Sequence, residues 1–180
     1  MFEKYALGCQ QFIDGVHYRL CQLVSWLTLF MVLLTFVIVV LRYGFDLGWI
    51  AMQESVMYLH AMVFLLGAAH TLKVNEHVRV DIFYRKMSEK KRLYVDIGGA
   101  LLLLMPVNGF IFVMSFDYVQ RSWILLESSP EAGGLPLVFL LKTFILIFAA
   151  SMNLQGLAEL IRNTLKLIHL PSNAFTKDCA

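Results

Sequence analysis

Residues 49–81 read WIAMQESVMYLHAMVFLLGAAHTLKVNEHVRVD, a long apolar run that leads directly into a charged segment. Between Trp49 and Leu72 the only charged side chain is Glu54, accompanied by two histidines. A hydrocarbon core of about 30 Å needs roughly 20 apolar residues in an α-helix. This stretch therefore predicts a membrane-spanning helix that ends at a charged surface.

Three further apolar runs have the same character. Leu23–Leu41 has no charge, Val95–Phe116 carries only Asp96, and Pro136–Leu160 carries only Lys142 and Glu159. We predict an all-α membrane protein with four transmembrane helices in a single domain of residues 1–180. The expected spans cover approximately residues 22–42, 49–72, 94–118 and 136–160.

The composition agrees with this class. Apolar residues make up 59% of the chain and charged residues 16%, against about 45–50% and 25% in soluble domains. The first span is too long for the apolar part of a signal peptide, and Arg42-Tyr43 follows it in place of small residues. It is expected to be a retained anchor. The three cysteines show no CxxC spacing and are expected to be structural.

The positive charges are unevenly distributed. Twelve of the 15 lysines and arginines lie in the N-terminal segment, the loop after the second span and the C-terminal tail. Cytoplasmic loops of membrane proteins carry such an excess, so both termini are expected in the cytoplasm. The net charge of +2 is then explained as a sorting signal and gives no reason to expect nucleic acid.

The segment before the first span has apolar residues at helical spacing, among them Tyr5, Cys9, Ile13, Val16 and Leu20. This pattern predicts an amphipathic helix over residues 2–20 that lies in the headgroup layer. A loosely ordered tail is the alternative. Later in the chain a helix is expected to start near Ser88, and Pro106 is expected to bend the third span.

Ionisable residues inside spans are costly and are therefore functional candidates. Glu54 lies five residues past Trp49 and Lys142 six residues past Pro136, so both reach a similar depth. We predict an ion pair between Glu54 and Lys142 that ties the second and fourth helices. The alternative is that each side chain extends separately to the outer interface.

Asn108 is expected to hydrogen-bond across helices. His60 and His70 differ by about 280° around a helix and cannot point into one site, which argues against a haem between the spans. His60 is instead expected to pack at a helix contact. No metal, cofactor or catalytic site is predicted.

The two outward loops offer polar groups to a soluble partner. Glu127 and Glu131 are most simply solvated charges, and a docking role remains open for them. The docking candidates are Asp46, Arg121, Glu127 and Glu131.

An ordered set of motifs then points to a family. Arg42-Tyr43-x-Phe45, Trp49 with Gln53-Glu54, Phe64 to Ala69 around Gly67, and His77-Val-Arg-Val-Asp81 closely resemble the small membrane subunit (DctQ type) of tripartite ATP-independent periplasmic (TRAP) transporters. The motif residues are Arg42, Tyr43, Trp49, Glu54, Gly67, His77 and Asp81. Many members carry Glu-Glu where this chain has Gln53-Glu54, so a role for two adjacent carboxylates is doubtful here. The segments 127–136 and 154–159 resemble a branch associated with organic-acid uptake.

The resemblance implies a multi-pass protein of the bacterial inner membrane without enzymatic activity. It implies a stable complex with a large DctM-type elevator subunit, transient contact with a periplasmic substrate-binding protein, and symport driven by sodium. Two other readings stay open: the membrane anchor of a respiratory complex that holds haem or quinone, and a small transporter that works alone as a homo-oligomer.

Overall fold

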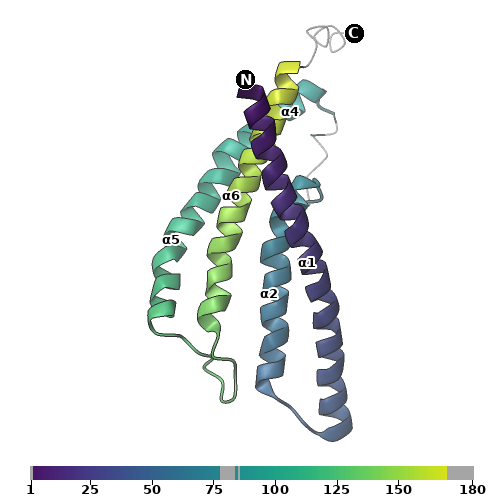
Figure 1. Cartoon of the computed structure of the whole chain (residues 1–180), viewed down its shortest axis with the longest axis vertical. Coiled ribbons are helices and arrows are strands. Elements are labelled where there is room, and N and C mark those ends of the chain that lie inside the picture. Colours follow the sequence, from purple (N-terminus) through teal and green to yellow (C-terminus); the bar gives the residue numbers. More distant parts are fainter. Residues whose placement is uncertain (1, 78–83, 85, 170–180) are drawn as a thin grey trace.

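The computed structural model describes residues 2–77, 84 and 86–169. In chain order the elements are α1 (Phe2–Phe45), α2 (Ile50–Lys73), α4 (Glu89–Gly99), the π-helix η1 (Ala100–Leu104), α5 (Met105–Ile124) and α6 (Val138–His169) (Figure 1). Every one of these elements is helical. Four stretches are long and apolar enough to cross a membrane: Leu7–Phe45, Ile50–Lys73, Glu89–Ile124 and Val138–His169. The prediction of an all-α chain with four such helices is confirmed.

The helices form two pairs, α1 with α2 and α5 with α6, and α6 joins the two pairs. α1 packs beside α2, α5 packs beside α6, and α6 also packs against α1, α2, α4 and η1. The N-terminus and the end of α6 lie at the same end of the molecule (Figure 1). We call this end the terminal end. The opposite end, with the connections 46–49 and 125–137, is called the loop end.

The first helix differs from the prediction. Residues 2–20 were expected to form a separate helix in the headgroup layer, but α1 runs without a break for 44 residues through the expected boundary. No proline interrupts it, and the hydroxyls of Ser25 and Thr28 donate to the carbonyls of Cys21 and Val24, one turn earlier in the same helix. At 1.5 Å per residue the helix is about 66 Å long, roughly twice the hydrocarbon thickness.

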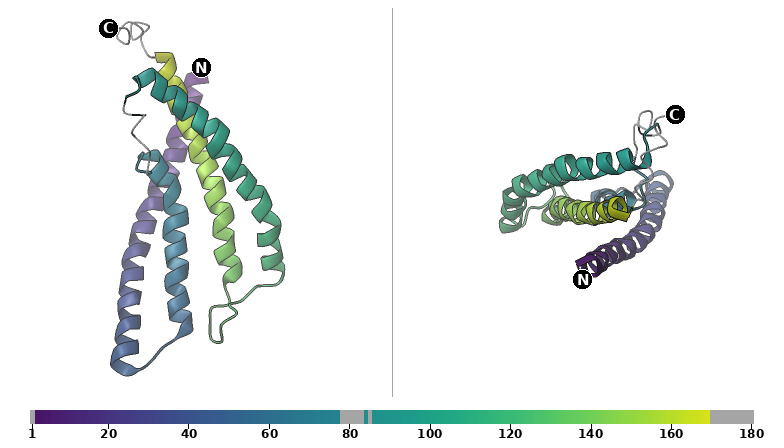
Figure 2. Two further views of the ribbon diagram at one scale, coloured as in Figure 1. Left: turned by 180° about the vertical axis from the view of Figure 1, so that it is seen from behind. Right: turned by 90° about the horizontal axis from the view of Figure 1, so that it is seen from above.

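The third membrane stretch is built from three segments. Its first helix, α4, begins after Ser88, as the sequence predicted, and continues without a loop into η1 and α5. Pro106, in the first turn of α5, lacks the N–H that the carbonyl of Leu102 would accept in a regular helix. The series of backbone hydrogen bonds along the helix is therefore interrupted just before Pro106, where the wider π turn lies. Figure 2 shows the combined α4–α5 helix as a curved rod.

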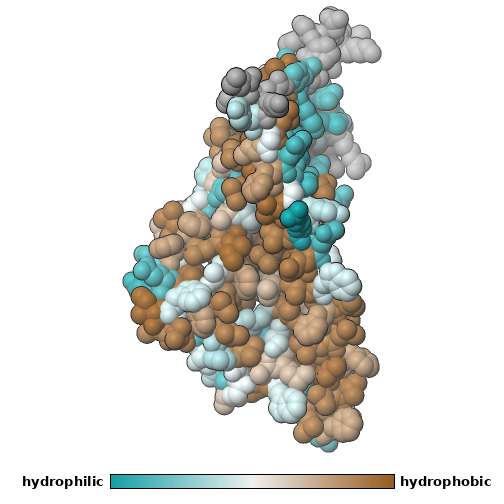
Figure 3. All heavy atoms as spheres, in the orientation of Figure 1, coloured by the Kyte–Doolittle hydropathy of each residue, from teal (hydrophilic) through white to brown (hydrophobic). Residues whose placement is uncertain are grey.

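The interior of this chain is small. About 22% of the most apolar window of α6 is buried, against 6% in each of the other three. Aromatic and aliphatic side chains cover most of the outer surface, and hydrophilic side chains gather toward the terminal end (Figure 3). The chain therefore leaves three of its four membrane stretches open to lipid or to another protein.

Candidate functional site

At the loop end, Glu54 fastens the α5–α6 connection to α2. One carboxylate oxygen accepts a hydrogen bond from the Ser129 hydroxyl, and the other accepts one from the backbone N–H of Leu135 at 2.6 Å. The connection closes on itself, because Ser129 N–H donates to the carbonyl of Leu135 at 3.1 Å. A Cβ at Gly134 would lie only 2.8 Å from the Glu54 carboxylate, so the tight approach requires glycine there.

A second carboxylate of the connection holds Lys142 of α6. Glu127 forms an ion pair with Lys142 and accepts a hydrogen bond from the Ser122 hydroxyl at 2.6 Å. The ammonium group also lies 4.0 Å from the centre of the Tyr118 ring. The hydrogen bonds from Lys142 and Ser122 lower the pKa of Glu127 below its ordinary value. We call the set Glu54, Glu127, Ser129, Leu135 and Lys142 the loop-end clasp.

The predicted ion pair between Glu54 and Lys142 is replaced in the structure by two separate attachments. Glu54 bonds to Ser129 and Leu135, and Lys142 bonds to Glu127. The two charges do lie toward the same end, as their spacing indicated. The connection 125–137 lies against both helices at the loop end, however, and offers each of the two charges a different partner.

The docking candidates fall into two groups. Asp46, Arg121 and Glu131 are exposed at the loop end. Asp46 has a φ of 54°, the left-handed conformation that aspartate tolerates better than most residues. Glu127 is not a simply solvated charge, because it is held by Lys142 and Ser122.

The family-motif residues do not form one site. Arg42, Tyr43 and Trp49 are exposed at the loop end, where Trp49 precedes the first turn of α2. Gly67 faces α1, since a Cβ there would lie 3.9 Å from a methyl of Val24. His77 follows α2 at the terminal end and is half-buried. Asp81 lies outside the described residues.

A buried polar network at the terminal end was missed by the sequence analysis. His17 of α1 is 3% exposed, and its Nδ1 lies 2.6 Å from the amide oxygen of Gln155 on α6. The Gln155 amide donates to Asp14 at 3.3 Å, and Asp14 pairs with Arg162 at 2.8 Å. Arg162 also pairs with Glu159 at 2.6 Å. We call Asp14, His17, Gln155, Glu159 and Arg162 the terminal-end network.

This network ties three helices together. α1 contributes Asp14 and His17, and α6 contributes the other members; Lys73 of α2 donates to the backbone carbonyl of Asp14 at 3.1 Å. The helical spacing of these residues was visible in the sequence, since Gln155, Glu159 and Arg162 recur at i, i+4 and i+7. A helix of residues 2–20 lying on the membrane surface would keep Asp14 and His17 away from α6. The contacts of these two residues with α6 were therefore not predicted.

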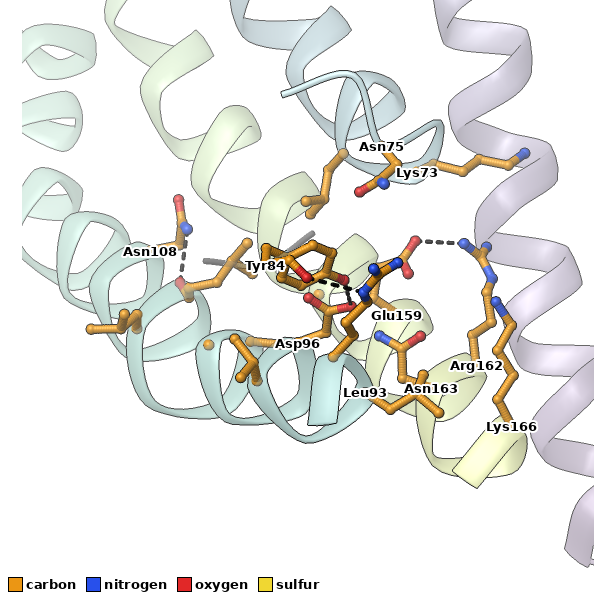
Figure 4. A pocket seen from close by; sticks show the side chains of 18 of the residues that line it. Lys73, Asn75, Tyr84, Leu93, Asp96, Asn108, Glu159, Arg162, Asn163 and Lys166 are labelled. Carbon is orange, nitrogen blue, oxygen red and sulfur yellow. Dashed lines mark hydrogen bonds and ion pairs between the residues drawn. The ribbon is translucent and has the colours of Figure 1, made fainter. Parts of the chain in front are cut away.

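Beside the network lies a cavity of about 880 Å³, between the end of α2, the α4–α5 helix and α6 (Figure 4). Its polar end includes Lys73, Arg92 and Arg162, and its apolar end includes Leu103 and Val107. Most of the charges already have protein partners: Arg92 donates to the carbonyls of Tyr84 and Met87, at 3.1 and 3.0 Å. Both positive and negative side chains line it, which favours a structural junction.

Asn108 lines the same cavity, but within the described part of the chain it does not bond across helices as predicted. Its amide donates to the carbonyl of Leu104, one turn earlier in the same helix, at 2.8 Å. The accepting carbonyl belongs to Leu104, the last residue of the π-helix η1. Asn108 therefore stabilises the irregular turn before Pro106.

Neither polar cluster resembles a catalytic site. Each joins segments that are distant in sequence, and each is satisfied mainly by bonds between protein groups. The geometry therefore indicates a structural role for both clusters: each holds helices together, one at each end of the helix bundle.

Comparisons with known proteins identify the family of the chain. Residues 31–166 match the family model of the tripartite ATP-independent periplasmic transporters, DctQ component. A protein of Haemophilus influenzae that bears the name of a TRAP transporter small permease protein is 31% identical over 110 residues. The match covers 59% of this chain and 63% of that relative, so the chain spans somewhat less than two thirds of its length. No solved structure matches.

The family match covers most of the chain: α2, α4, η1 and α5 in full, α6 up to residue 166, and α1 from residue 31 onward. The predicted resemblance is confirmed, and the chain belongs to the DctQ-component family of the tripartite ATP-independent periplasmic transporters.

Proposed function

We propose that this chain is the small permease subunit of a TRAP secondary transporter for organic acids in a bacterial inner membrane, with both termini in the cytoplasm. It binds a large DctM-type elevator subunit in a stable complex and forms part of the immobile scaffold. The coupled movement of substrate and sodium then belongs to the large subunit.

The observation that carries this proposal is that polar contacts hold the helices together at both ends of the bundle. The loop-end clasp joins α2 to α6, and the terminal-end network joins α1, α2 and α6. A domain that moves as an elevator needs a neighbour that does not move with it. Helices fixed at two depths resist tilting, because any tilt would break buried polar contacts.

The exposed surface supports a role in a larger assembly. Large apolar side chains stand open along α1, α2 and α5, far more than an isolated soluble chain would tolerate. Part of this surface faces lipid, and part is available to a membrane partner.

Transient docking of the periplasmic binding protein is assigned to the loop end. Asp46, Arg121 and Glu131 are exposed there and supply both signs of charge. Glu127 is given a different role, since it holds the connection through Lys142. Exposed charges of this kind mainly affect the association rate and its salt dependence.

The test is reconstitution. We expect the chain to co-purify with the large subunit, and organic-acid uptake into proteoliposomes to need both, together with the binding protein. Uptake by this chain alone, or failure to co-purify, contradicts the proposal. A Soret band in the purified chain would indicate a haem-bearing anchor instead.

A further inference from the structure

His60 occupies an unusual position on α2. It is the eleventh of the 24 residues of this helix, roughly 15 Å from one end and 20 Å from the other at 1.5 Å per residue. Its depth is therefore near the middle of the bilayer. The sequence suggested that it packs at a helix contact, and in this chain by itself its side chain is exposed.

An exposed imidazole at this depth requires a partner. Ionisable residues in membrane helices almost always face the bundle interior or a water-filled cavity, because lipid tails offer no hydrogen bond. The ring contact given for His60 is with Phe64, one turn away on the same helix, at 5.0 Å. Within the described residues, no side chain or backbone group hydrogen-bonds to the imidazole.

His60 belongs to a continuous stripe on the outer face of α2. Gln53, Met57, His60 and Phe64 follow one another at i, i+4, i+7 and i+11, and all four are exposed. This is the spacing with which one helix meets another along a shared seam. The stripe thus has the form of a helix-packing surface that carries an amide and an imidazole.

The stripe borders a groove between α1 and α2. The groove has a volume of about 510 Å³, and its lining includes Met31, Thr35, Gln53, Val56, Met57 and His60. Its two methionines have flexible side chains that adapt to the shape of a neighbour. The Thr35 hydroxyl donates to the carbonyl of Met31 at 2.8 Å, which leaves Gln53 and His60 as the polar groups that need an outside partner.

The outer face of α5 and η1 gives the contrast. At comparable depth its strongly exposed side chains are all apolar, including Leu102, Phe110 and Val113 at 71, 64 and 65% exposure. Such a surface suits lipid tails. The face formed by α1 and α2 therefore carries polar groups that need hydrogen-bonding partners, whereas the face formed by η1 and α5 is apolar at this depth.

We propose that the groove between α1 and α2, with the stripe from Gln53 to Phe64, seats a transmembrane helix of the large permease subunit. This rests on the proposed function, since it presumes that such a subunit is the partner. The bound helix supplies hydrogen-bonding groups to His60 and Gln53 within the membrane. The face formed by η1 and α5 remains in contact with lipid.

Photocrosslinking in the assembled complex tests the position of this seat. A photoreactive benzoylphenylalanine replaces Met57, which is 51% exposed in the groove, or Val113, which is 65% exposed on α5 and serves as the control. We expect irradiation to join position 57, and not position 113, to the large subunit. A product at position 113 alone overturns the inference, as does a product at position 57 that contains two copies of this chain.

The two proposals fail in different ways. If the large subunit does not co-purify with the unsubstituted chain, the proposed function is wrong. If it co-purifies and position 57 gives no product, only the assignment of the groove is wrong.

A second experiment tests the polar groups themselves. His60→Leu and Gln53→Leu replace them with side chains that lipid accepts, so the isolated chain should keep its thermal stability. Association with the large subunit should weaken about 3- to 10-fold for each hydrogen bond lost. The control Phe110→Leu should leave association unchanged. Unaltered association of the double leucine variant would contradict the proposal.

Discussion

At the scale of single residues, Glu54 holds the loop end together. Its two carboxylate oxygens bind groups from two points of the α5–α6 connection, the Ser129 hydroxyl and the Leu135 N–H. The two attachments lie 75 and 81 residues away along the chain. One side chain on α2 therefore determines where this connection lies.

We expect Glu54→Gln to destabilise the bundle, because the neutral amide has one acceptor oxygen and one NH2 group in place of the two accepting oxygens. A hydrogen bond to a charged group contributes about 1.5–3 kcal/mol. Unfolding in mixed micelles should show a loss of this order, together with faster proteolysis between residues 127 and 135. Glu131→Gln on the same connection is the matched control and should change neither. Equal behaviour of the two variants would contradict the role assigned to Glu54.

Glu127 makes the loop-end clasp sensitive to acid. Its pKa is lower in the folded chain than the ordinary value of 4.5, chiefly because Lys142 donates a hydrogen bond to the carboxylate and Ser122 donates another. A carboxylate with a lowered pKa stabilises the fold above its unfolded pKa. That contribution is lost as the pH falls through the folded pKa. The attachment is thus complete at neutral pH and weakens below about pH 4.5.

The fluorescence of Trp123 can follow this change. Its indole donates to Thr143 of α6 at 2.9 Å, and its ring lies 4.7 Å from that of Phe139. In a Trp26→Phe, Trp49→Phe background, we expect an acid transition below pH 4.5 that is absent in Glu127→Gln. A transition of the same size in both proteins would assign it to another group.

At the scale of elements, α6 is the helix on which the others assemble. It lies close to the third membrane stretch at Gly156, where a Cβ would press on the Leu104 side chain and lie 3.5 Å from Met105. The glycine of α6 and the π turn of η1 thus fit together. The bend near Pro106 is part of this contact.

Gly156→Val should separate α6 from this turn. Overpacking a close helix contact typically costs about 1–3 kcal/mol. The terminal methyl of Leu104 can move aside more easily for the single methyl of alanine than for the larger side chain of valine. We expect a graded loss of thermal stability, smaller for Gly156→Ala. Gly109→Ala, where a Cβ meets nothing within 4 Å, is the control and should be neutral or slightly stabilising. A neutral Gly156→Val would show that the helices are not held at this distance.

At the scale of the whole molecule, the two ends carry different chemistry. The terminal end holds the terminal-end network and the charged cavity, and the loop end holds the loop-end clasp. The excess of lysine and arginine at the terminal end favours its placement in the cytoplasm.

Cysteine labelling checks this orientation. In a chain whose own cysteines are replaced by serine, Ser128→Cys marks the loop end and Glu76→Cys the terminal end; both positions are exposed. An impermeant maleimide should label position 128 when only the outer membrane is open. Position 76 should react only after the inner membrane is disrupted. The reverse pattern would invert the proposed topology.

Much of this architecture was readable in the amino-acid sequence. The four apolar runs, the helix start at Ser88, the bend near Pro106 and the family motifs from Arg42 to Asp81 are local patterns. Apolar length and the missing N–H of proline act on the segment that contains them, whatever surrounds it. For that reason the fold class and the family were accessible without coordinates.

The tertiary structure alone decided which side chains meet. Lys142 reaches Glu127 instead of Glu54, His17 finds Gln155 across 138 residues, and His60 faces outward. Such pairings depend on the rotation of each helix about its axis and on the path of the loops between them. Spacing along one helix carries no information on either, so only the packed bundle settles them.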